Sequence, residues 1–240
     1  MGFWALEAGI VPPARRERLV AHLENARQFK RRHRVPSLSA SHPEFDPRGR
    51  YWCGGVWPPT NYMVLRGLSR NGFHRLAYEI GLNHVENVTR VWQRTGQVWE
   101  NYAPDMCAPG SESRPDLVGW SALGPIAVLL EYVLGVQAFP DEGRLVWHIN
   151  RLEAHGVRNY PFGKKGTVSL ECDLRRREEA APRVRIHADV PVKVEIDWDR
   201  GSRSYRDLIP PDHRAAGGSE LPVPSSQVAV GGSRRFAAGR

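Results

Sequence analysis

Residues 51–96, YWCGGVWPPTNYMVLRGLSRNGFHRLAYEIGLNHVENVTRVWQRTG, carry the clearest architectural pattern of the chain. An aromatic, glycine-containing loop leads into Pro58-Pro59, and a helix tolerates proline at its first positions. Gly72 is expected to end this helix, and a longer helix follows from about Phe73 to Arg94. Two helices joined by a tight turn predict an antiparallel hairpin. The stripe of the longer helix comprises Ala77, Ile80, His84, Val88, Val91 and Trp92.

Further helices are predicted on both sides of this hairpin. Apolar residues at three- and four-residue spacing favour a surface helix from Pro13 to about Lys30. The stretch from Arg32 to Gly55 is rich in Pro, Ser, Gly and Asp, which favour turns, so a long loop is expected there. The run GWSALGPIAVLLEYVLGV, Gly119 to Val136, is apolar nearly all round, as expected of a helix buried inside a larger helical assembly.

The pattern changes after Phe139-Pro140. Apolar residues now alternate with polar ones in several short runs, which predicts strands and a small β-sandwich. The alternating sets are Leu145, Trp147 and Ile149, then Val168, Leu170 and Cys172, then Val184, Ile186 and Ala188, then Val192, Val194 and Ile196. From about Pro210 onward, Gly, Ser, Pro, Ala and Arg dominate, which is typical of a disordered tail. The predicted segments are a helical portion 1–138, a β-sandwich 139–208 and a tail 209–240.

Composition and charge narrow the class of protein. The net charge is +8, but the basic residues are scattered and no DNA- or RNA-binding motif accompanies them, so a nucleic-acid partner is not expected. No apolar run reaches the roughly 18 residues of a membrane span, and the N-terminus does not resemble a signal peptide. Three widely spaced cysteines favour neither disulfides nor a metal knuckle, which fits the cytoplasm. No metal and no organic cofactor are expected.

Two loops concentrate aromatic and polar residues directly before helices. They are residues 51–57, YWCGGVW, and residues 98–105, VWENYAPD. Aromatic rings cover the apolar faces of sugars, while carboxylates and amides bind sugar hydroxyls, so both loops suit a carbohydrate site. The alternative is that these aromatic side chains are hydrophobic anchors for the helix ends.

Three segments in order carry a family resemblance. YWCGGVWPPTNYMVLRGL, TGQVWENYAPD and VGWSALGPI resemble the corresponding motifs of family-63 glycoside hydrolases, which include mannosylglycerate hydrolases and processing α-glucosidases. The same order of motifs is more distantly similar to the trehalases. The resemblance implies a mainly α fold: the C-terminal part of an (α/α)6 barrel, an incomplete ring of helical hairpins, followed by the β-sandwich.

The resemblance also implies roles for individual residues. It makes Glu100 the general base of an inverting hydrolysis that acts on an α-glycosidic bond of an oligosaccharide or small glycoside. It places sugar-binding residues around this base, with core packing as an equal alternative for Trp120. The implied substrate-binding residues are Tyr51, Trp52, Trp57, Asn101, Tyr102 and Trp120.

The chain departs from the family pattern in one essential group. An inverting hydrolase needs a general acid about 6.5–9.5 Å from the base, and the family carries it as an aspartate much earlier in the chain. Nothing before Tyr51 matches the surroundings of that aspartate, and Asp105 and Asp116 are weak substitutes. The expectation is therefore a fragment that carries the base and needs a missing N-terminal barrel half as its partner. The alternative is a non-catalytic carbohydrate-binding or vestigial protein.

Overall fold

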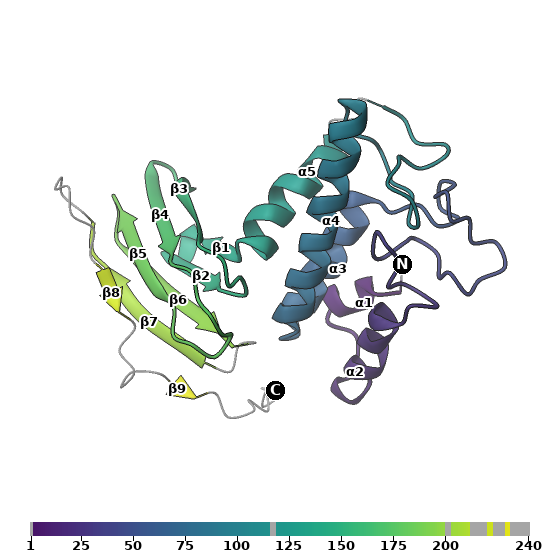
Figure 1. Cartoon of the computed structure of the whole chain (residues 1–240). Helices are drawn as coiled ribbons and strands as arrows, with labels where there is room; N and C mark the ends of the chain where they lie inside the picture. Colours follow the sequence, from purple (N-terminus) through teal and green to yellow (C-terminus); the bar gives the residue numbers. More distant parts are fainter. Residues whose placement is uncertain (1, 116–118, 200–202, 212–219, 223–228, 231–240) are drawn as a thin grey trace. The chain divides into compact units, whose positions relative to one another are not determined.

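The computed structural model describes residues 2–115, 119–199, 203–211, 220–222 and 229–230. The chain divides into two compact units, Met1–Val133 and Leu134–Arg240. In Figure 1 the helices α1 to α5 belong to the first unit, and the labelled strands belong to the second. Each unit has a hydrophobic core of its own.

The first unit is helical. Its elements are α1 (Trp4–Glu7), α2 (Pro13–Ala21), the 3₁₀ turn η1 (His22–Glu24), α3 (Pro58–Arg70), α4 (His74–Thr95), α5 (Gly119–Val128) and the π-helical turn η2 (Leu129–Val133). The helix predicted from Pro13 to Lys30 is shorter than expected. Asn25 is extended, and its side-chain oxygen accepts a hydrogen bond from the backbone N–H of Arg27, so a local turn replaces the helix.

The predicted helical hairpin is present as α3 and α4, which pack against each other. Gly72 has a φ of +82° in the turn between them, where a residue with a side chain would be strained. The predicted stripe of α4 is buried except at one end: Val88 and Val91 lie in the interior, whereas Trp92 is 52% exposed. The prediction for Trp92 is wrong because the next helical position turns about 100° away from Val91.

α3 lies at the centre of the helical unit and contacts α1, α4 and α5. Its buried side chains Leu65 and Leu68 share a core with Leu6, Leu23 and Ile80. Fully burying one such aliphatic side chain stabilises a fold by roughly 1.5–3 kcal/mol. The long segment between η1 and α3, residues 25–57, contains no helix or strand and leads directly to the aromatic loop.

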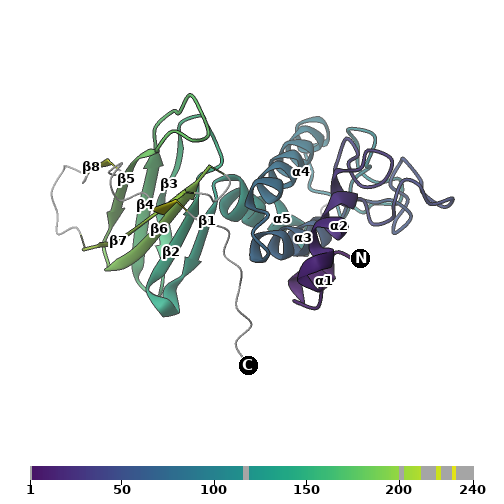
Figure 2. The same cartoon turned by 90° about the horizontal axis from the view of Figure 1, so that it is seen from below.

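The second unit consists of strands and the short 3₁₀ turn η3 (Pro140–Glu142). The strands are β1 (Val136–Phe139), β2 (Arg144–His148), β3 (His155–Phe162), β4 (Gly166–Cys172), β5 (Arg183–Ala188), β6 (Val192–Trp198), β7 (Arg203–Ile209), β8 (Glu220–Pro222) and β9 (Ala229–Val230). They form one sheet in the order β1-β2-β6-β7-β9 and another in the order β3-β4-β5-β8, both visible in Figure 2. The two sheets contribute alternate side chains to one common core.

The prediction of a mainly α protein is wrong. Helices account for 33% and strands for 23% of the described residues, and the strands form two sheets. The closing helix is shorter than predicted, because α5 and η2 end at Val133 and Val136 opens β1. Strands β1, β3 and β7 were not predicted. In β3 the register shifts between Val157 and Tyr160, so the sequence does not alternate regularly.

The segment predicted as a disordered tail, 209–240, lies mostly outside the described residues. Within it the structure describes β8, which pairs with β5, and β9, which pairs with β7. The segment limits 1–138, 139–208 and 209–240 remain predictions.

Candidate active site

Backbone hydrogen bonds join the two aromatic loops. The N–H of Val56 donates to the carbonyl of Tyr102 at 2.8 Å, and the N–H of Tyr102 donates to the carbonyl of Val56 at 2.9 Å. Both residues are completely buried, so these bonds are shielded from competing water. This pairing brings segments 51–57 and 98–105 together, although more than forty residues separate them in the chain.

The first loop folds its three aromatic rings into a cluster. The rings of Trp52 and Trp57 are stacked with centroids 4.2 Å apart, and the Tyr51 ring meets Trp57 edge-on at 5.1 Å. Trp57 is only 1% exposed, and its indole N–H donates to the carbonyl of Tyr51 at 3.3 Å. Tyr51 and Trp52 are 45% and 36% exposed. Trp57 therefore supports the cluster from inside, and Tyr51 and Trp52 form its accessible surface.

Tyr51 is held in an uncommon backbone conformation. Its φ of +42° lies in the left-handed region, which residues with a side chain rarely adopt. Such conformations cost of order 1–3 kcal/mol and persist where the surrounding structure enforces them, often at functional sites. Here the Tyr51 carbonyl accepts both the Trp57 indole bond and the backbone N–H of Gly55 at 3.0 Å.

Helix α5 brings the third motif to the same place. Trp120 is 50% exposed, and its ring lies 6.1 Å from that of Trp57 at an interplanar angle of 71°. The neighbouring Ser121 is buried, and its hydroxyl donates to the carbonyl of Glu100 at 3.0 Å. The three motifs that carry the family resemblance therefore converge within the helical unit.

Glu100 belongs to the second loop, is joined to α5 by the Ser121 bond to its carbonyl, and is partly exposed. Its backbone N–H donates to the carbonyl of Arg114 at 3.0 Å. Among the described residues no ion pair or hydrogen bond engages its carboxylate. A carboxylate of this kind, held by its backbone and open to solvent, has the chemistry required to accept a proton from water.

Asn101 is wedged between two glycines. A Cβ atom at Gly110 would lie 1.9 Å from the Asn101 side-chain oxygen, and one at Gly55 would lie 3.2 Å from it. Asn101 is completely buried, and neither polar atom of its amide has a hydrogen-bond partner among the described residues. Burying an unpaired amide costs stability. The packing of Gly55 and Gly110 around the Asn101 side chain therefore holds it in this position.

Tyr102 is a structural residue of the second loop. Its ring is completely buried, its hydroxyl accepts a hydrogen bond from the backbone N–H of Trp99 at 3.2 Å, and burial raises its pKa. With Val56, Val88 and Val91 it forms a small hydrophobic cluster. Of the predicted site residues, Tyr51, Trp52, Trp120 and Glu100 are accessible to solvent, whereas Trp57, Asn101 and Tyr102 are buried.

Two aspartates near these loops, Asp46 and Asp105, are engaged in ion pairs with arginines. Asp105 binds the guanidinium of Arg31 through both of its oxygens at 2.8 Å. Asp46 is paired with Arg48, whose hydrogen bond lowers the pKa of Asp46. Asp116 lies outside the described residues. The described part of the chain therefore presents one unengaged carboxylate, that of Glu100, among these candidates.

A buried pair of histidines, His33 and His84, lies next to Tyr102 of the second loop and was not predicted. His33 and His84 share a hydrogen bond of 3.0 Å between ring nitrogens, and the His33 ring lies 5.6 Å from that of Tyr102. Burial lowers the pKa of His84 to about 4 and, together with the neighbouring His84, lowers that of His33 well below its usual value. Because 51 positions separate the two residues, no spacing pattern in the sequence points to this pair.

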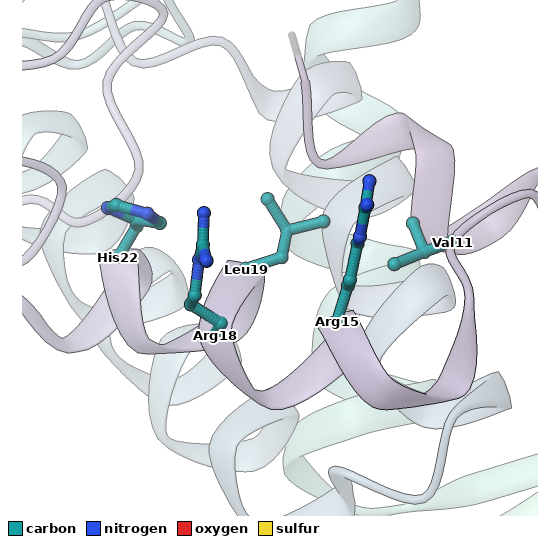
Figure 3. A pocket seen from close by; sticks show the side chains of 5 residues that line it. All are labelled: Val11, Arg15, Arg18, Leu19 and His22. Carbon is teal, nitrogen blue, oxygen red and sulfur yellow. The ribbon is translucent and has the colours of Figure 1, made fainter.

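Surface hollows of about 420 Å³ lie away from these motifs. Figure 3 shows one along α2, where the side chains of Val11, Arg15, Arg18, Leu19 and His22 project from the preceding loop and one face of the helix. Another, in the second unit, lies over β3, β4 and β5 and contains the ion pairs of Arg158 and Arg185 with Glu171. Neither hollow is lined by a residue of the three motifs.

Two further observations concern metals and membranes. Within the described ranges, no group of three or more His, Cys, Asp or Glu side chains is arranged to hold a metal ion. Among the same residues, no helix combines the length and apolar character needed to cross a membrane.

Comparison with known proteins shows what this chain is similar to. Residues 1–114 match the family model of the mannosylglycerate hydrolase MGH1-like glycoside hydrolase domain. The mannosylglycerate hydrolase of Thermus thermophilus is 41% identical over 76 residues, which cover 32% of this chain and 18% of that protein. The probable mannosyl-oligosaccharide glucosidase of Schizosaccharomyces pombe is 32% identical over 99 residues, which cover 37% of this chain and 12% of that protein.

A solved structure, the family-63 mannosylglycerate hydrolase from Thermus thermophilus in complex with glucose, is 31% identical to this chain. The match has a TM-score of 0.42 and covers 53% of this chain and 29% of that one. The family-model match and the similar curated proteins relate the chain to glycoside hydrolases. Within that class its relatives belong to family 63, which confirms the resemblance carried by the three motifs. The chain spans well under half the length of these relatives.

Proposed function

We propose that this chain carries the general-base side of an inverting α-glycoside hydrolase, with Glu100 as the base. The supporting observation is the convergence of the three motifs, through the Val56–Tyr102 pairing and the Ser121–Glu100 hydrogen bond, around the Glu100 carboxylate, which has no ion-pair or hydrogen-bond partner among the described residues. In this mechanism Glu100 removes a proton from a water molecule as the water oxygen attacks the anomeric carbon. The bond to the leaving oxygen breaks, that oxygen takes a proton from a general acid, and the anomeric configuration inverts.

The sugar ring would stack on the accessible aromatic surface. Tyr51 and Trp52 present exposed rings above the buried Trp57, and Trp120 is exposed on α5. Aromatic faces contact the apolar faces of a pyranose at low entropic cost. The names of the relatives, a mannosylglycerate hydrolase and a mannosyl-oligosaccharide glucosidase, support a mannoside or glucoside as the substrate.

The general acid would come from a segment that this chain does not provide, either a separate polypeptide or a further part of a longer protein. Such a partner would contact exposed apolar side chains at the end of the helical unit. Ile126 on α5 and Leu129 on the adjoining turn η2 are 60% and 39% exposed. Exposed apolar side chains that lie one helical turn apart suit an interaction surface. The cytoplasm is our proposed compartment, supported by three cysteines that are all free thiols.

Glycosyl fluorides test the base without the acid. Fluoride leaves without needing a proton, so a chain that holds only the base can hydrolyse α-D-mannosyl or α-D-glucosyl fluoride. We expect fluoride release by the wild type and a loss of about 10²–10⁴ in rate for Glu100→Gln, because that is the usual contribution of general base catalysis. Glu112→Gln, an exposed glutamate of the same loop, is the matched control and should remain within about twofold of wild type.

The stereochemistry of the product gives an independent readout. Proton NMR of the first product should show the β-anomer, because a single displacement inverts the α configuration. Equal rates for wild type and Glu100→Gln would contradict the role of Glu100. The α-anomer as first product would contradict inversion.

A second candidate is carbohydrate binding without hydrolysis. It is favoured by the absence of a second unengaged carboxylate among the candidates within the described residues. Titration of tryptophan fluorescence with mannose, glucose and mannosylglycerate distinguishes the two. Saturable quenching without fluoride release would favour the binding protein, whereas release that depends on Glu100 would favour the hydrolase.

A further inference from the structure

We infer that Ser121 is a positioning residue that fixes the proposed base Glu100 relative to the aromatic wall of α5; this inference rests on the function proposed above. The Ser121 hydroxyl donates to the carbonyl oxygen of Glu100 at 3.0 Å, and Ser121 is completely buried. The bond therefore acts on the backbone of the base and leaves its carboxylate untouched.

The other hydrogen bonds to the backbones of Glu100 and Asn101 come from their own loop, while the neighbouring Tyr102 is paired with Val56. The N–H of Glu100 donates to the carbonyl of Arg114, and the N–H of Asn101 donates to the hydroxyl of Ser113 at 3.0 Å. The same Ser113 hydroxyl donates back to the carbonyl of Asn101 at 2.9 Å. These bonds define the conformation of the loop, but they do not determine where the loop lies against α5.

Ser121 supplies that connection. It follows Trp120 in α5, and the Trp120 ring reaches to 6.1 Å from Trp57. The first turn of α5 thus carries both the exposed Trp120 ring and the Ser121 hydroxyl that binds the backbone carbonyl of Glu100. If the hydroxyl is lost, Glu100 can shift along α5 while the aromatic surface that binds the sugar stays in place. Misplacement of a catalytic group by about 1 Å can cost as much as 10²-fold in rate.

A positioning role for Ser121 predicts that its loss lowers kcat and leaves KM unchanged, whereas a purely structural role does not predict this split. Removing the hydroxyl should lower kcat for α-D-mannosyl or α-D-glucosyl fluoride, whichever is turned over faster, while KM stays constant because the aromatic platform is unchanged. For Ser121→Ala we expect kcat to fall about tenfold with KM within about twofold of wild type. Ser121→Thr, which keeps the hydroxyl, should restore kcat to within about twofold.

Two further variants complete the series. Ser121→Cys keeps the approximate volume but donates only weakly, so its kcat should resemble that of Ser121→Ala. Ser111→Ala, an exposed serine of the same loop, is the matched control and should not change kcat or KM. If Ser121→Ala proves unstable, the comparison of Ser121→Cys with Ser121→Thr still isolates the hydroxyl donor.

The inference is overturned if kcat is the same for Ser121→Thr, Ser121→Cys and wild type, or if kcat and KM change together in Ser121→Ala. Glu100→Gln, measured in parallel, distinguishes a failure of the positioning role of Ser121 from a failure of the proposed function. If Glu100→Gln abolishes hydrolysis and the Ser121 variants do not reduce kcat, only the positioning role fails. If Glu100→Gln retains wild-type activity, or the wild type releases no fluoride, the proposed function fails and the positioning role fails with it.

Discussion

Acid should destabilise the helical unit through the buried pair His33–His84. The two rings share a hydrogen bond of 3.0 Å and both are buried, so a proton on either ring would place a charge in the interior. Burial lowers the pKa of His84 from 6.5 to about 4. The pKa of His33 is also lowered, first by burial and then by repulsion from His84.

The sign and the size of the effect follow from these pKa values. Above pH 6.5 the imidazoles are neutral in both the folded and the unfolded chain, and the full stability is present. As the pH falls from 6.5 towards 4, the unfolded chain takes up protons that the folded chain does not, so stability is lost. The difference of roughly 2.5 between the two pKa values of His84 corresponds to about 3 kcal/mol, of which about 2 kcal/mol is lost between about pH 7.5 and 5.

Urea unfolding at about pH 7.5 and about pH 5 measures this loss. Six of the eight tryptophans lie in residues 1–133, so tryptophan fluorescence chiefly follows the helical unit. Wild type should lose about 2 kcal/mol more than His84→Gln over this range, because the variant lacks the titrating ring. His42→Gln, which removes an exposed imidazole, should lose as much as wild type. A difference between wild type and His84→Gln below about 0.5 kcal/mol, the scale of ordinary surface substitutions, would refute the reasoning.

Two other predictions concern the candidate site. Gly110→Ala places a Cβ atom 1.9 Å from the Asn101 side-chain oxygen and 2.7 Å from the Gly49 carbonyl, so we expect a loss of roughly 1–3 kcal/mol in unfolding free energy. Gly119→Ala meets no atom within 4 Å and serves as the control; equal stability of the two variants would contradict the packing argument. Trp52→Ala should weaken sugar binding in fluorescence titrations by about tenfold, since an accessible stacking face is lost. Trp92→Ala, which removes an exposed tryptophan of α4, should leave the affinity unchanged, and a similar loss in both would argue against stacking on Trp52.

Local signals predicted much of the secondary structure. Pro58 and Gly72 bound the helix α3 as expected, and the alternating residues of β4, β5 and β6 point into the core. The fold class was wrong in part because β3 and β7 carry no regular alternation, and because β1 begins at Val136, where the closing helix was predicted to end. Asn159 has a φ of +53° where the register of β3 shifts, and such a bulge interrupts the two-residue period by which strands are recognised.

The sequence predicted which residues belong to the candidate site, but it did not predict which of them are buried or how they contact one another. An aromatic residue in a loop has the same sequence signature whether its ring faces solvent or the interior, so the burial of Trp57 beneath Trp52 could not be predicted. The pairing of Val56 with Tyr102 uses backbone groups alone, so the pattern of side chains in the sequence does not indicate it. For the same reason the role of Ser121 becomes visible only when its hydroxyl is placed against the Glu100 carbonyl.

In the proposed function, this chain provides the loop that carries Glu100, and a partner would have to add the general acid. The hydrogen bonds to the backbones of Glu100 and Asn101 come from residues 110–121 of the same chain, and the aromatic cluster rests on the chain's own Trp57. The backbone geometry around the proposed base is thus set inside a chain that spans well under half the length of its relatives. A general acid supplied from outside this chain would meet a loop whose backbone contacts this chain already makes. Addition of such a partner should therefore raise the rate on substrates whose leaving group needs a proton and have little effect on glycosyl fluorides.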